Sequence, residues 1–261
     1  MTYCVGLLLD QGLVMASDSR TNAGVDHISS YSKLHVFQPA PDRYFVLLAA
    51  GNLATTREVV DRIRRDLDRG TAGGFDGSGA PPETLATVQY LFEAALYIGR
   101  VNREVQLLHG PALREVGAAP EATFILGGRI GNEPPALLLI YPQGNAIAAT
   151  PETPYLQIGE SKFGKPELDR FAHRGLSLED GARLCLVSLE STARANLTVA
   201  PPFEVVLCPG DGYGPSQRLR LDASSPELIV LTESWEASQR RAFESLPAFS
   251  WEVPSADMGP G

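Results

Sequence analysis

Residues 2–20, TYCVGLLLDQGLVMASDSR, hold two short apolar runs on either side of a turn. The runs cover residues 2–9 and 12–18, and both are rich in the aliphatic residues that fill strands. The segment Asp10-Gln11-Gly12 between them places a glycine after polar residues, which is a hairpin signal. The sequence therefore predicts that the chain begins with an antiparallel strand pair.

The length of this turn decides which residues of the two strands face each other. A three-residue loop would pair Leu9 with Leu13 and place Thr2 opposite Arg20. Asp18 would then be a diagonal neighbour of Thr2 on the same face, within reach of its side chain. A two-residue loop would reverse the faces. We predict the three-residue loop, with a carboxylate beside the chain start.

The rest of the sequence divides into blocks of strands and blocks of helices. Two further strands make the first 51 residues resemble one antiparallel sheet, and the apolar period then changes to that of amphipathic helices. The helix that starts at Ser177 has a capping-box signature. The predicted strands are 33–38, 43–50, 122–130, 135–141, 145–149, 155–159, 203–208, 217–221 and 227–232; the predicted helices are 53–67, 83–108, one from about 163, 177–192 and 233–246; and 70–82 and 253–261 are predicted as a loop and a tail.

This order does not alternate strands with helices, as βαβ units do. It favours an α+β fold in which two antiparallel sheets pack face to face and a pair of helices covers each outer side. Such a four-layer αββα sandwich would bury every apolar face. We expect residues 1–210 to form this domain and residues 211–261 to form a C-terminal extension packed on it, with a flexible tail, as a candidate for contacts between subunits.

Composition argues against several classes of protein. The 22 basic and 31 acidic residues give a formal charge of −9, so nucleic-acid binding is not expected. The three cysteines are widely spaced and favour a reducing cytoplasm over a disulfide framework or a zinc knuckle. The first apolar run stops at Asp10, and no run reaches the ~18 apolar residues of a membrane span. The four histidines lack ligand spacing, so neither a metal nor a cofactor is expected.

Thr2 is the first candidate for chemistry, because methionine aminopeptidases remove Met1 before small residues such as threonine. An N-terminal threonine carries a nucleophilic hydroxyl and a base on one residue. Its α-amine has a reference pKa of about 7.7–8.0 and can accept the hydroxyl proton as the oxygen attacks a carbonyl. A start with Met-Thr is also common in proteins without such chemistry.

Three more residues give Thr2 possible partners. Asp18 needs a cation if it is buried, and Lys33 is the next basic residue after Arg20. A lysine beside Thr2 would lower the pKa of the α-amine by repulsion between like charges. Gly51, between a strand and a helix, would offer a backbone N–H to an oxyanion. Taken singly, these residues also fit a solvated turn, an exposed strand start and an ordinary strand-to-helix turn.

The combination of Thr2, the segment Ala16-Ser17-Asp18-Ser19-Arg20, Lys33 and Ala50-Gly51 resembles the threonine peptidases of proteasome type. Within them the sequence is most similar to Anbu, the bacterial "ancestral beta subunit" group, over roughly residues 2–210. The most similar stretches are TYCVG at 2–6, SDSRTNAGVD at 17–26 and IGESKFGKP at 158–166. The resemblance implies an N-terminal-nucleophile hydrolase fold and self-assembly into a ring or ring-like homo-oligomer. It also implies that Thr2 is the nucleophile, that Asp18 and Lys33 support it, and that the Gly51 N–H binds the oxyanion.

Two segments depart from the family's pattern. Proteasome subunits have a Gly-Ser-Gly segment with a supporting serine, and the matching place reads Gly159-Glu160-Ser161, so Ser161 would substitute from a shifted position or cap the following helix. An Asp and a Ser/Thr-Gly pair are also expected near the end of the second helical block. That region reads ANLTVA at 195–200, without an aspartate.

These features lead to three hypotheses. The first is a cytoplasmic threonine hydrolase that cleaves peptide or amide bonds with the catalytic residues Thr2, Asp18, Lys33, Gly51 and Ser161. The second, motivated by the two departures, is a ring-forming scaffold with little or no activity. The third is a small-molecule amidohydrolase on the same fold.

Overall fold

The structure is a computed structural model that describes residues 2–22, 28–71, 83–249 and 251–252. These residues form two five-stranded antiparallel sheets and one small hairpin. The first sheet has the order β10 (Tyr155–Gly159), β1 (Tyr3–Leu9), β2 (Gly12–Asp18), β11 (Phe203–Pro209) and β12 (Gln217–Leu221). The second has the order β5 (Leu34–Ala40), β6 (Arg43–Gly51), β7 (Ala122–Ile130), β8 (Ala136–Ile140) and β9 (Ala146–Ala148). The predicted α+β class with antiparallel sheets is confirmed.

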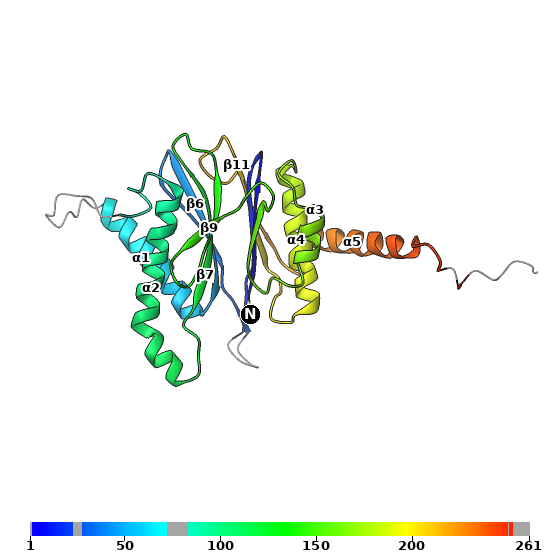
Figure 1. Cartoon of the computed structure of the whole chain (residues 1–261), viewed down its shortest axis with the longest axis horizontal. Coiled ribbons are helices and arrows are strands. Elements are labelled where there is room, and N and C mark those ends of the chain that lie inside the picture. The colour runs from blue at the N-terminus through cyan, green and yellow to red at the C-terminus, as the bar shows by residue number, and fades with distance from the viewer. Residues whose placement is uncertain (1, 23–27, 72–82, 250, 253–261) are drawn as a thin grey trace, which may run out of the picture.

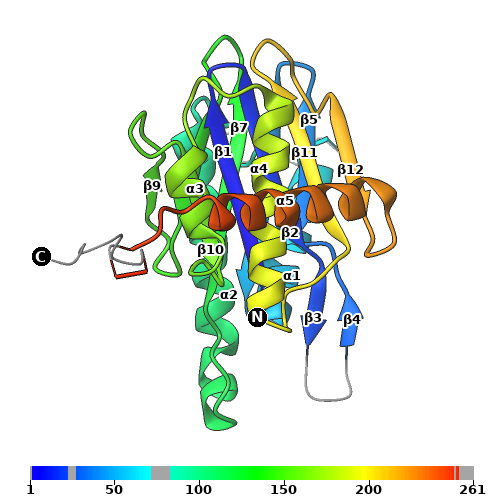
Figure 2. The ribbon, with the colours of Figure 1, turned by 90° about the vertical axis from the view of Figure 1, so that its right-hand side faces the viewer.

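The helices lie on the outer faces of the sheets (Figure 1). Helices α1 (Leu53–Thr71) and α2 (Leu91–Glu115) pack on the second sheet, and α3 (Lys165–Phe171) and α4 (Leu178–Ala195) pack on the first. A third apolar cluster, which contains Leu13 and Met15 of β2 and Val46 and Leu48 of β6, fills the space between the sheets. Helix α5 (Pro226–Glu244) crosses α4 on the outside (Figure 2).

The sequence suggested that the first 51 residues form one antiparallel sheet, but in the structure they contribute to both sheets. Strands β1 and β2 belong to the first sheet and β5 and β6 to the second, because β2 pairs with the distant β11. Every residue of β1 and β2 is buried, which is typical of strands covered on both faces. Between β2 and β5, β3 (Arg20–Asn22) and β4 (Ile28–Ser30) form a hairpin that the sequence analysis missed, since strands of three residues leave little pattern.

The predicted register of the first hairpin is wrong by one residue. Leu9 pairs with Gly12, so the loop is the two residues Asp10 and Gln11, and Cys4 faces Ser17. Gly12 is a strand residue because β11 runs against it: its φ is +139°, and a Cβ there would lie 2.1 Å from the Cys208 carbonyl oxygen. Only a glycine tolerates that approach. Gly12 was predicted as a turn residue, but it is required here by the packing of β2 against β11.

Two other predicted elements are wrong. Helix α2 begins at Leu91 and not at residue 83, because the buried Arg43 guanidinium donates hydrogen bonds to the carbonyls of Ala86 (2.9 Å) and Val88 (2.8 Å). These bonds hold a turn where the apolar pattern suggested helix. The predicted strand 227–232 is the start of α5, which Pro226 opens at a position that suits proline.

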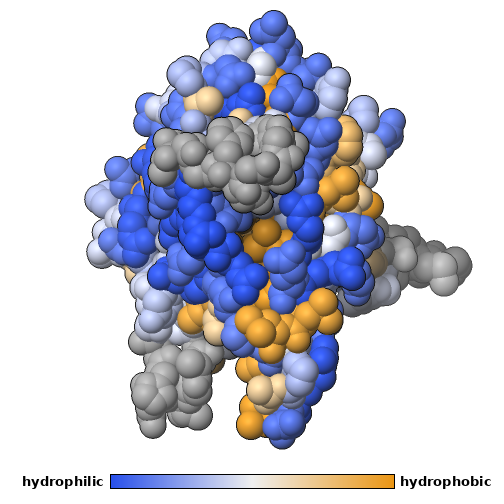
Figure 3. Space-filling view, turned by 90° about the vertical axis from the view of Figure 1, so that its left-hand side faces the viewer, coloured by the Kyte–Doolittle hydropathy of each residue, from blue (hydrophilic) through white to orange (hydrophobic). Residues whose placement is uncertain are grey.

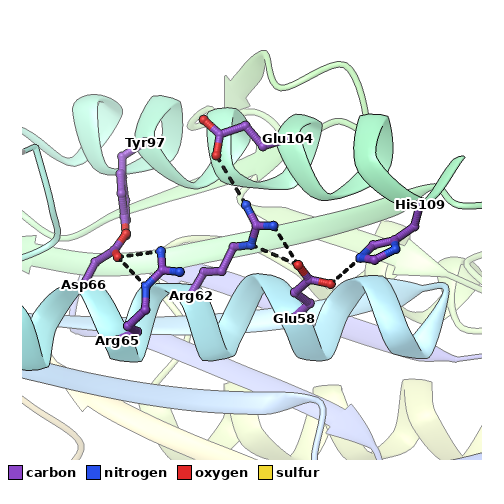
Figure 4. Close-up of polar contacts among 7 residues, drawn as sticks. All are labelled: Glu58, Arg62, Arg65, Asp66, Tyr97, Glu104 and His109. Carbon is purple, nitrogen blue, oxygen red and sulfur yellow. Dashed lines mark hydrogen bonds and ion pairs between the residues drawn. The ribbon is translucent and has the colours of Figure 1, made fainter.

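Charged side chains link α1 and α2 on the outer surface (Figure 4). The Glu58 carboxylate of α1 contacts Arg62 on the same helix (2.7 Å) and the ring nitrogen of His109 on α2 (2.7 Å). Tyr97 of α2 donates a hydrogen bond to Asp66 of α1 (2.9 Å). Figure 3 shows that this side of the molecule is largely hydrophilic with apolar areas among the charges. The large apolar residues exposed on α2 are Phe92, Leu96, Leu107 and Leu108. The ion pairs and hydrogen bonds between α1 and α2 are partly exposed to solvent, so each stabilises the helix pair only modestly.

No helix among the described residues is long and apolar enough to cross a bilayer.

Phe124→Ala tests whether the cluster under α1 and α2 supports the fold. Phe124 is fully buried on β7, and truncation of a buried phenylalanine costs about 3–5 kcal/mol of unfolding free energy. Phe92→Ala is the matched control, since Phe92 is 55% exposed on α2 and its truncation should change stability by less than about 0.5 kcal/mol. Denaturant midpoints measure both; similar losses in the two variants would contradict this view of the core.

Candidate functional site

Five positions far apart in the sequence lie at starts or ends of strands on the side of the two sheets where the chain begins; Figures 1 and 2 mark that N-terminus. On the first sheet Thr2 directly precedes β1, Asp18 ends β2 and Gly159 ends β10. On the second sheet Lys33 directly precedes β5 and Gly51 ends β6. Antiparallel pairing brings strand starts and strand ends to the same edge, so the topology gathers residues that the sequence scatters.

Asp18 and Lys33 form a buried ion pair between the two sheets. The Lys33 Nζ donates to the Asp18 Oδ1 at 2.7 Å and to the Arg20 carbonyl oxygen at 2.7 Å. Their side chains are 0% and 6% exposed, which excludes the solvated turn and the exposed strand start as explanations. The same Asp18 Oδ1 accepts the backbone N–H of Tyr3 at 3.0 Å. One carboxylate oxygen therefore joins the lysine to the residue next to Thr2.

The surroundings of Asp18 act on its pKa in opposite directions. Burial raises the pKa of the carboxyl, while the Lys33 ammonium and the backbone N–H groups of Tyr3 and Ala200 lower it. The overall direction is upward. Lys33 is the partner that makes a buried Asp18 charge tolerable, so each of the two ions depends on the other.

The backbone of Thr2 is held by the turn after β10. The Glu160 N–H donates to the Thr2 carbonyl oxygen at 2.7 Å. Gly159 has a φ of +84°, and a Cβ there would lie 1.9 Å from that same carbonyl oxygen. Thr2 itself is half-buried. Glycine is therefore required at 159 both by backbone conformation and by the close approach of the chain start.

Gly51 also occupies a position that only glycine suits. Its φ is +117°, and a Cβ would lie 2.3 Å from the Glu121 carbonyl oxygen. The next residue, Asn52, caps α1 by accepting the Thr55 N–H at 3.2 Å. On the other side of Gly51, the N–H of Ala49 in β6 donates to the Lys33 carbonyl oxygen at 3.0 Å. The structure thus links Gly51 to the Lys33 segment through β6, and no hydrogen bond joins Gly51 to Thr2 among the described residues.

Ser161 lies in the turn that holds Thr2. Its backbone N–H donates to the Gly159 carbonyl at 3.0 Å, and its carbonyl accepts from Gln157 Nε2 at 3.3 Å. These are backbone contacts, so they place the residue without assigning a task to its hydroxyl.

The two segments that depart from the family's pattern contact each other. The Asn196 Nδ2 donates to the Glu160 Oε2 at 3.0 Å. The Asn196 Oδ1 accepts the Thr198 hydroxyl at 2.6 Å and the Thr198 N–H at 3.0 Å. Glu160 and Asn196 are thus one connected polar group beside the chain start.

Sequence reasoning missed the buried hydrogen-bond chain that begins at Tyr3. Gln157 Nε2 donates to the Tyr3 Oη (2.5 Å), the Tyr3 O–H lies 2.6 Å from Ser188 Oγ, and Ser188 donates to the Gly164 carbonyl (2.8 Å). Burial raises the pKa of Tyr3, which keeps the hydroxyl a donor. A tyrosine, a glutamine and a serine in otherwise apolar segments were the available signal.

The expectations for Cys4 and for a metal site can be compared with the structure of the same region. Cys4 is fully buried between the sheets, its Sγ is 3.7 Å from the Ala49 carbonyl oxygen, and burial raises the pKa of its thiol. It packs as a small core residue. Within the described parts of the chain no group of three or more His, Cys, Asp or Glu side chains is arranged to hold a metal ion.

Comparison with solved structures identifies similar proteins. An Anbu (Gly-1) mutant from Hyphomicrobium sp. strain MC1 is 39% identical, with a TM-score of 0.85, and the match covers 96% of this chain and 100% of the other. Anbu (ancestral beta-subunit) from Yersinia bercovieri is 39% identical, with a TM-score of 0.84 and coverage of 95% and 98%. A structure described as a helical assembly of the Anbu complex from Pseudomonas aeruginosa is 37% identical, with a TM-score of 0.84 and coverage of 97% and 98%. Neither a protein-family model nor a curated protein sequence matches the chain.

Gly159→Ala should displace the chain start. A left-handed backbone costs an alanine about 1–2 kcal/mol, and at 159 the collision with the Thr2 carbonyl adds to this, so we expect a total loss of about 3 kcal/mol or more. Gly117→Ala is the matched control: its φ is +72° and a Cβ there meets nothing within 4 Å. Urea denaturation compares the two variants, and equal losses would show that the close approach to Thr2 is not limiting.

Lys33→Met should destabilise the protein in a pH-dependent way. Removal of one partner from a buried ion pair costs about 3–5 kcal/mol at neutral pH. Without Lys33, only the N–H groups of Tyr3 and Ala200 oppose the effect of burial, so the folded-state pKa of Asp18 lies further above its unfolded value. The folded state then binds more protons than the unfolded state, and stability falls as pH rises from the unfolded pKa through the folded pKa. The loss should therefore be smaller at pH 4.5 than at pH 7.

Lys165→Met provides the control for this pH dependence, because the Lys165–Asp169 pair is exposed at the surface of α3. Its unfolding free energy should change little at either pH. Unfolding free energies of both variants at the two pH values measure the effect, and a Lys33→Met loss that is independent of pH would contradict the coupling to Asp18.

Proposed function

Because the chain belongs to the proteasome-like Anbu (ancestral beta-subunit) family, we propose that it is a threonine-type hydrolase of peptide or amide bonds. Its nucleophile is Thr2, freed by removal of Met1. The observation that carries the proposal is the buried Asp18–Lys33 pair, whose shared oxygen also binds the backbone N–H that follows Thr2. A buried charge pair at the chain start is hard to explain by stability alone, since such pairs often contribute little net stabilisation.

The chemistry follows from these groups. The Thr2 hydroxyl oxygen attacks the substrate carbonyl carbon, and its proton passes to the Thr2 α-amine. The positive charge of Lys33 disfavours a second positive charge nearby, so it lowers the pKa of the amine and favours the neutral form that acts as a base. The Gly51 N–H stabilises the oxyanion. Collapse of the tetrahedral intermediate breaks the C–N bond, the ammonium returns its proton to the leaving amine, and water then hydrolyses the Thr2 ester by the same steps.

The polar group formed by Glu160, Asn196 and Thr198 supports an intact site despite the unusual residues. In this proposal the contact between Asn196 and Glu160 holds the turn whose N–H binds the Thr2 carbonyl. Ser161 lies in the same turn, one position after the place of the serine in the Gly-Ser-Gly segment of proteasome subunits, and we propose that it serves as the supporting serine from there. We therefore propose that these departures change the supporting residues without removing the nucleophile.

The wider assignments belong to the same proposal. In this proposal the two sheets and their outer helix pairs constitute the four-layer αββα sandwich of N-terminal-nucleophile hydrolases, formed by residues 1–210 with β12 added at the edge of the first sheet. Residues 211–261, which include β12 and α5, extend this domain and contribute contacts between subunits of a cytoplasmic homo-oligomer. The helical assembly described for the relative from Pseudomonas aeruginosa supports self-assembly.

The alternative is a scaffold without catalysis, favoured by one observation: the Glu160 carboxylate lies in the turn beside Thr2, at the place where the Gly-Ser-Gly segment of proteasome subunits has its serine. A small-molecule amidohydrolase is a narrower form of the hydrolase hypothesis. Unfolded protein, short peptides and small amides form the substrate panel that separates them, and turnover of small amides alone would favour the narrower form.

Thr2→Ala tests the nucleophile. An electrophile that traps N-terminal threonine should add once to the wild-type chain and not to Thr2→Ala, and turnover should fall at least about 1000-fold, as for removal of a nucleophile in other acyl-transfer enzymes. Intact-mass spectrometry counts the adducts and shows whether the labelled chain begins at Thr2, and peptide mapping locates the adduct. Thr2→Ser, which keeps a hydroxyl and the amine, is the control and should retain labelling.

The outcome that contradicts the hydrolase is equally direct. If the labelled or active chain retains Met1, the amine of Thr2 is part of a peptide bond and cannot be the base. If neither labelling nor turnover is found for a chain that starts at Thr2, the scaffold becomes the better explanation.

A further inference from the structure

A second buried carboxylate, Glu204 on β11, lies behind the Asp18–Lys33 pair, and the mechanism above does not use it. It is 5% exposed, in a strand whose other residues are mostly apolar. We propose that Glu204 is a positioning residue for Lys33 and acts through the hydroxyl of Ser32. This inference rests on the proposed function for its catalytic meaning, while the placement of Lys33 can be measured independently.

Glu204 belongs to a row of residues that crosses the first sheet. Cys4 of β1 faces Ser17 of β2, Ser17 faces Glu204 of β11, and Glu204 faces Arg220 of β12. Phe203, the neighbour of Glu204, faces Asp18 in the next row toward the site. The carboxylate is therefore one residue row behind the ion pair.

The two oxygens of Glu204 contact different parts of the molecule. Oε1 accepts a hydrogen bond from the Arg220 Nη1 at 3.1 Å, and Oε2 accepts one from the Ser32 hydroxyl at 2.6 Å. The Ser32 Oγ also lies 2.8 Å from the Leu34 carbonyl oxygen. Ser32 leads into β5 of the second sheet, so this bond, like the Asp18–Lys33 pair, connects the two sheets.

The position of Ser32 makes this connection relevant to Lys33, its direct neighbour. Around them, the backbone is also fixed by the Tyr31 N–H on the Ser19 carbonyl (2.9 Å) and by the Lys33 carbonyl on the Ala49 N–H (3.0 Å). The lysine side chain has a flexible stem of four carbons and loses much conformational entropy when its ammonium is fixed. An anchored backbone reduces the freedom that remains, and the ammonium can then bind Asp18 and the Arg20 carbonyl together.

Arg220 extends the connection to the C-terminal part of the chain. Its side chain is 48% exposed, and its guanidinium supplies the counter-charge that the buried Glu204 requires. The strand β12, beyond residue 210, thus has a bonded path through Glu204 and Ser32 to the lysine of the site.

The sequence offers an unusually clean measurement, because it has only three lysines: Lys33, Lys162 and Lys165. Limited acetylation followed by mass spectrometry compares Lys33 with the exposed Lys162 in the same molecule. Ser32→Ala removes the hydrogen bond without changing charge. It should raise the relative acetylation rate of Lys33 about 5-fold, the factor that corresponds to one ordinary hydrogen bond. Glu204→Gln should act in the same direction.

The pH midpoint of acylation at the Thr2 α-amine distinguishes positioning from a simple loss of charge. If Lys33 moves away, the amine becomes easier to protonate and its midpoint rises. Loss of the Glu204 charge acting only through space would lower the midpoint instead. We expect a rise in both variants. Arg218→Ala, an exposed change on β12 two residues from Arg220, is the control and should leave both readouts unchanged.

Each result decides the proposal. If Ser32→Ala and Glu204→Gln lower the melting temperature but leave the relative acetylation of Lys33 unchanged, Glu204 is a structural tie and the proposal is overturned. If Lys33 responds while the wild-type chain shows no turnover, the positioning stands and the hydrolase function fails. If Met1 is retained, the Lys33 rate alone decides.

Discussion

The buried contact between Asp18 and Lys33 is the constraint on which the rest of the site depends. It brings an ammonium from one sheet against a carboxylate from the other, and both are shielded from water. In such surroundings neither ion is stable without its partner. The Asp18 oxygen that binds the lysine also binds the backbone of Tyr3, so one atom couples the position of the lysine to that of the chain start and to the spacing of the sheets at this edge.

Sequence patterns identified much of the fold because most strands are apolar on both faces and most turns contain glycine or proline. Strand β7 matches its predicted range fully, and Asp18 and Lys33 form the contact that was predicted because a buried carboxylate needs a cation and Lys33 is the next basic residue after Arg20. The hairpin register was wrong because Gly12 serves the approach of β11, a strand about 190 residues away. The start of α2 was wrong because a buried arginine binds the carbonyls before it. Both errors come from tertiary contacts that no local window contains.

The polar residues around the site form a second layer whose members are also distant in sequence. The turn after β10 holds the Thr2 carbonyl, the Tyr3 hydroxyl leads to Ser188 on α4, and Asn196 joins Glu160 to Thr198. None of these contacts follows from the periodicity of a strand or helix. A single polar residue inside an apolar segment was the only local sign of each, and the partner could be found only in three dimensions.

The edge opposite the site is built from turns that take no part in these contacts. Asp10-Gln11, Pro41-Asp42 and the exposed segment 132–134 connect strands at the ends farthest from Thr2 in the pairing order. The segment 132–134 lies beyond Gly128 and Ala136, the last paired residues of β7 and β8, so an insertion there would leave the register of these strands intact. An N-terminal fusion would bury the residue of greatest interest inside a longer chain, so the turn between β7 and β8 is the natural place for an affinity tag or a fluorophore.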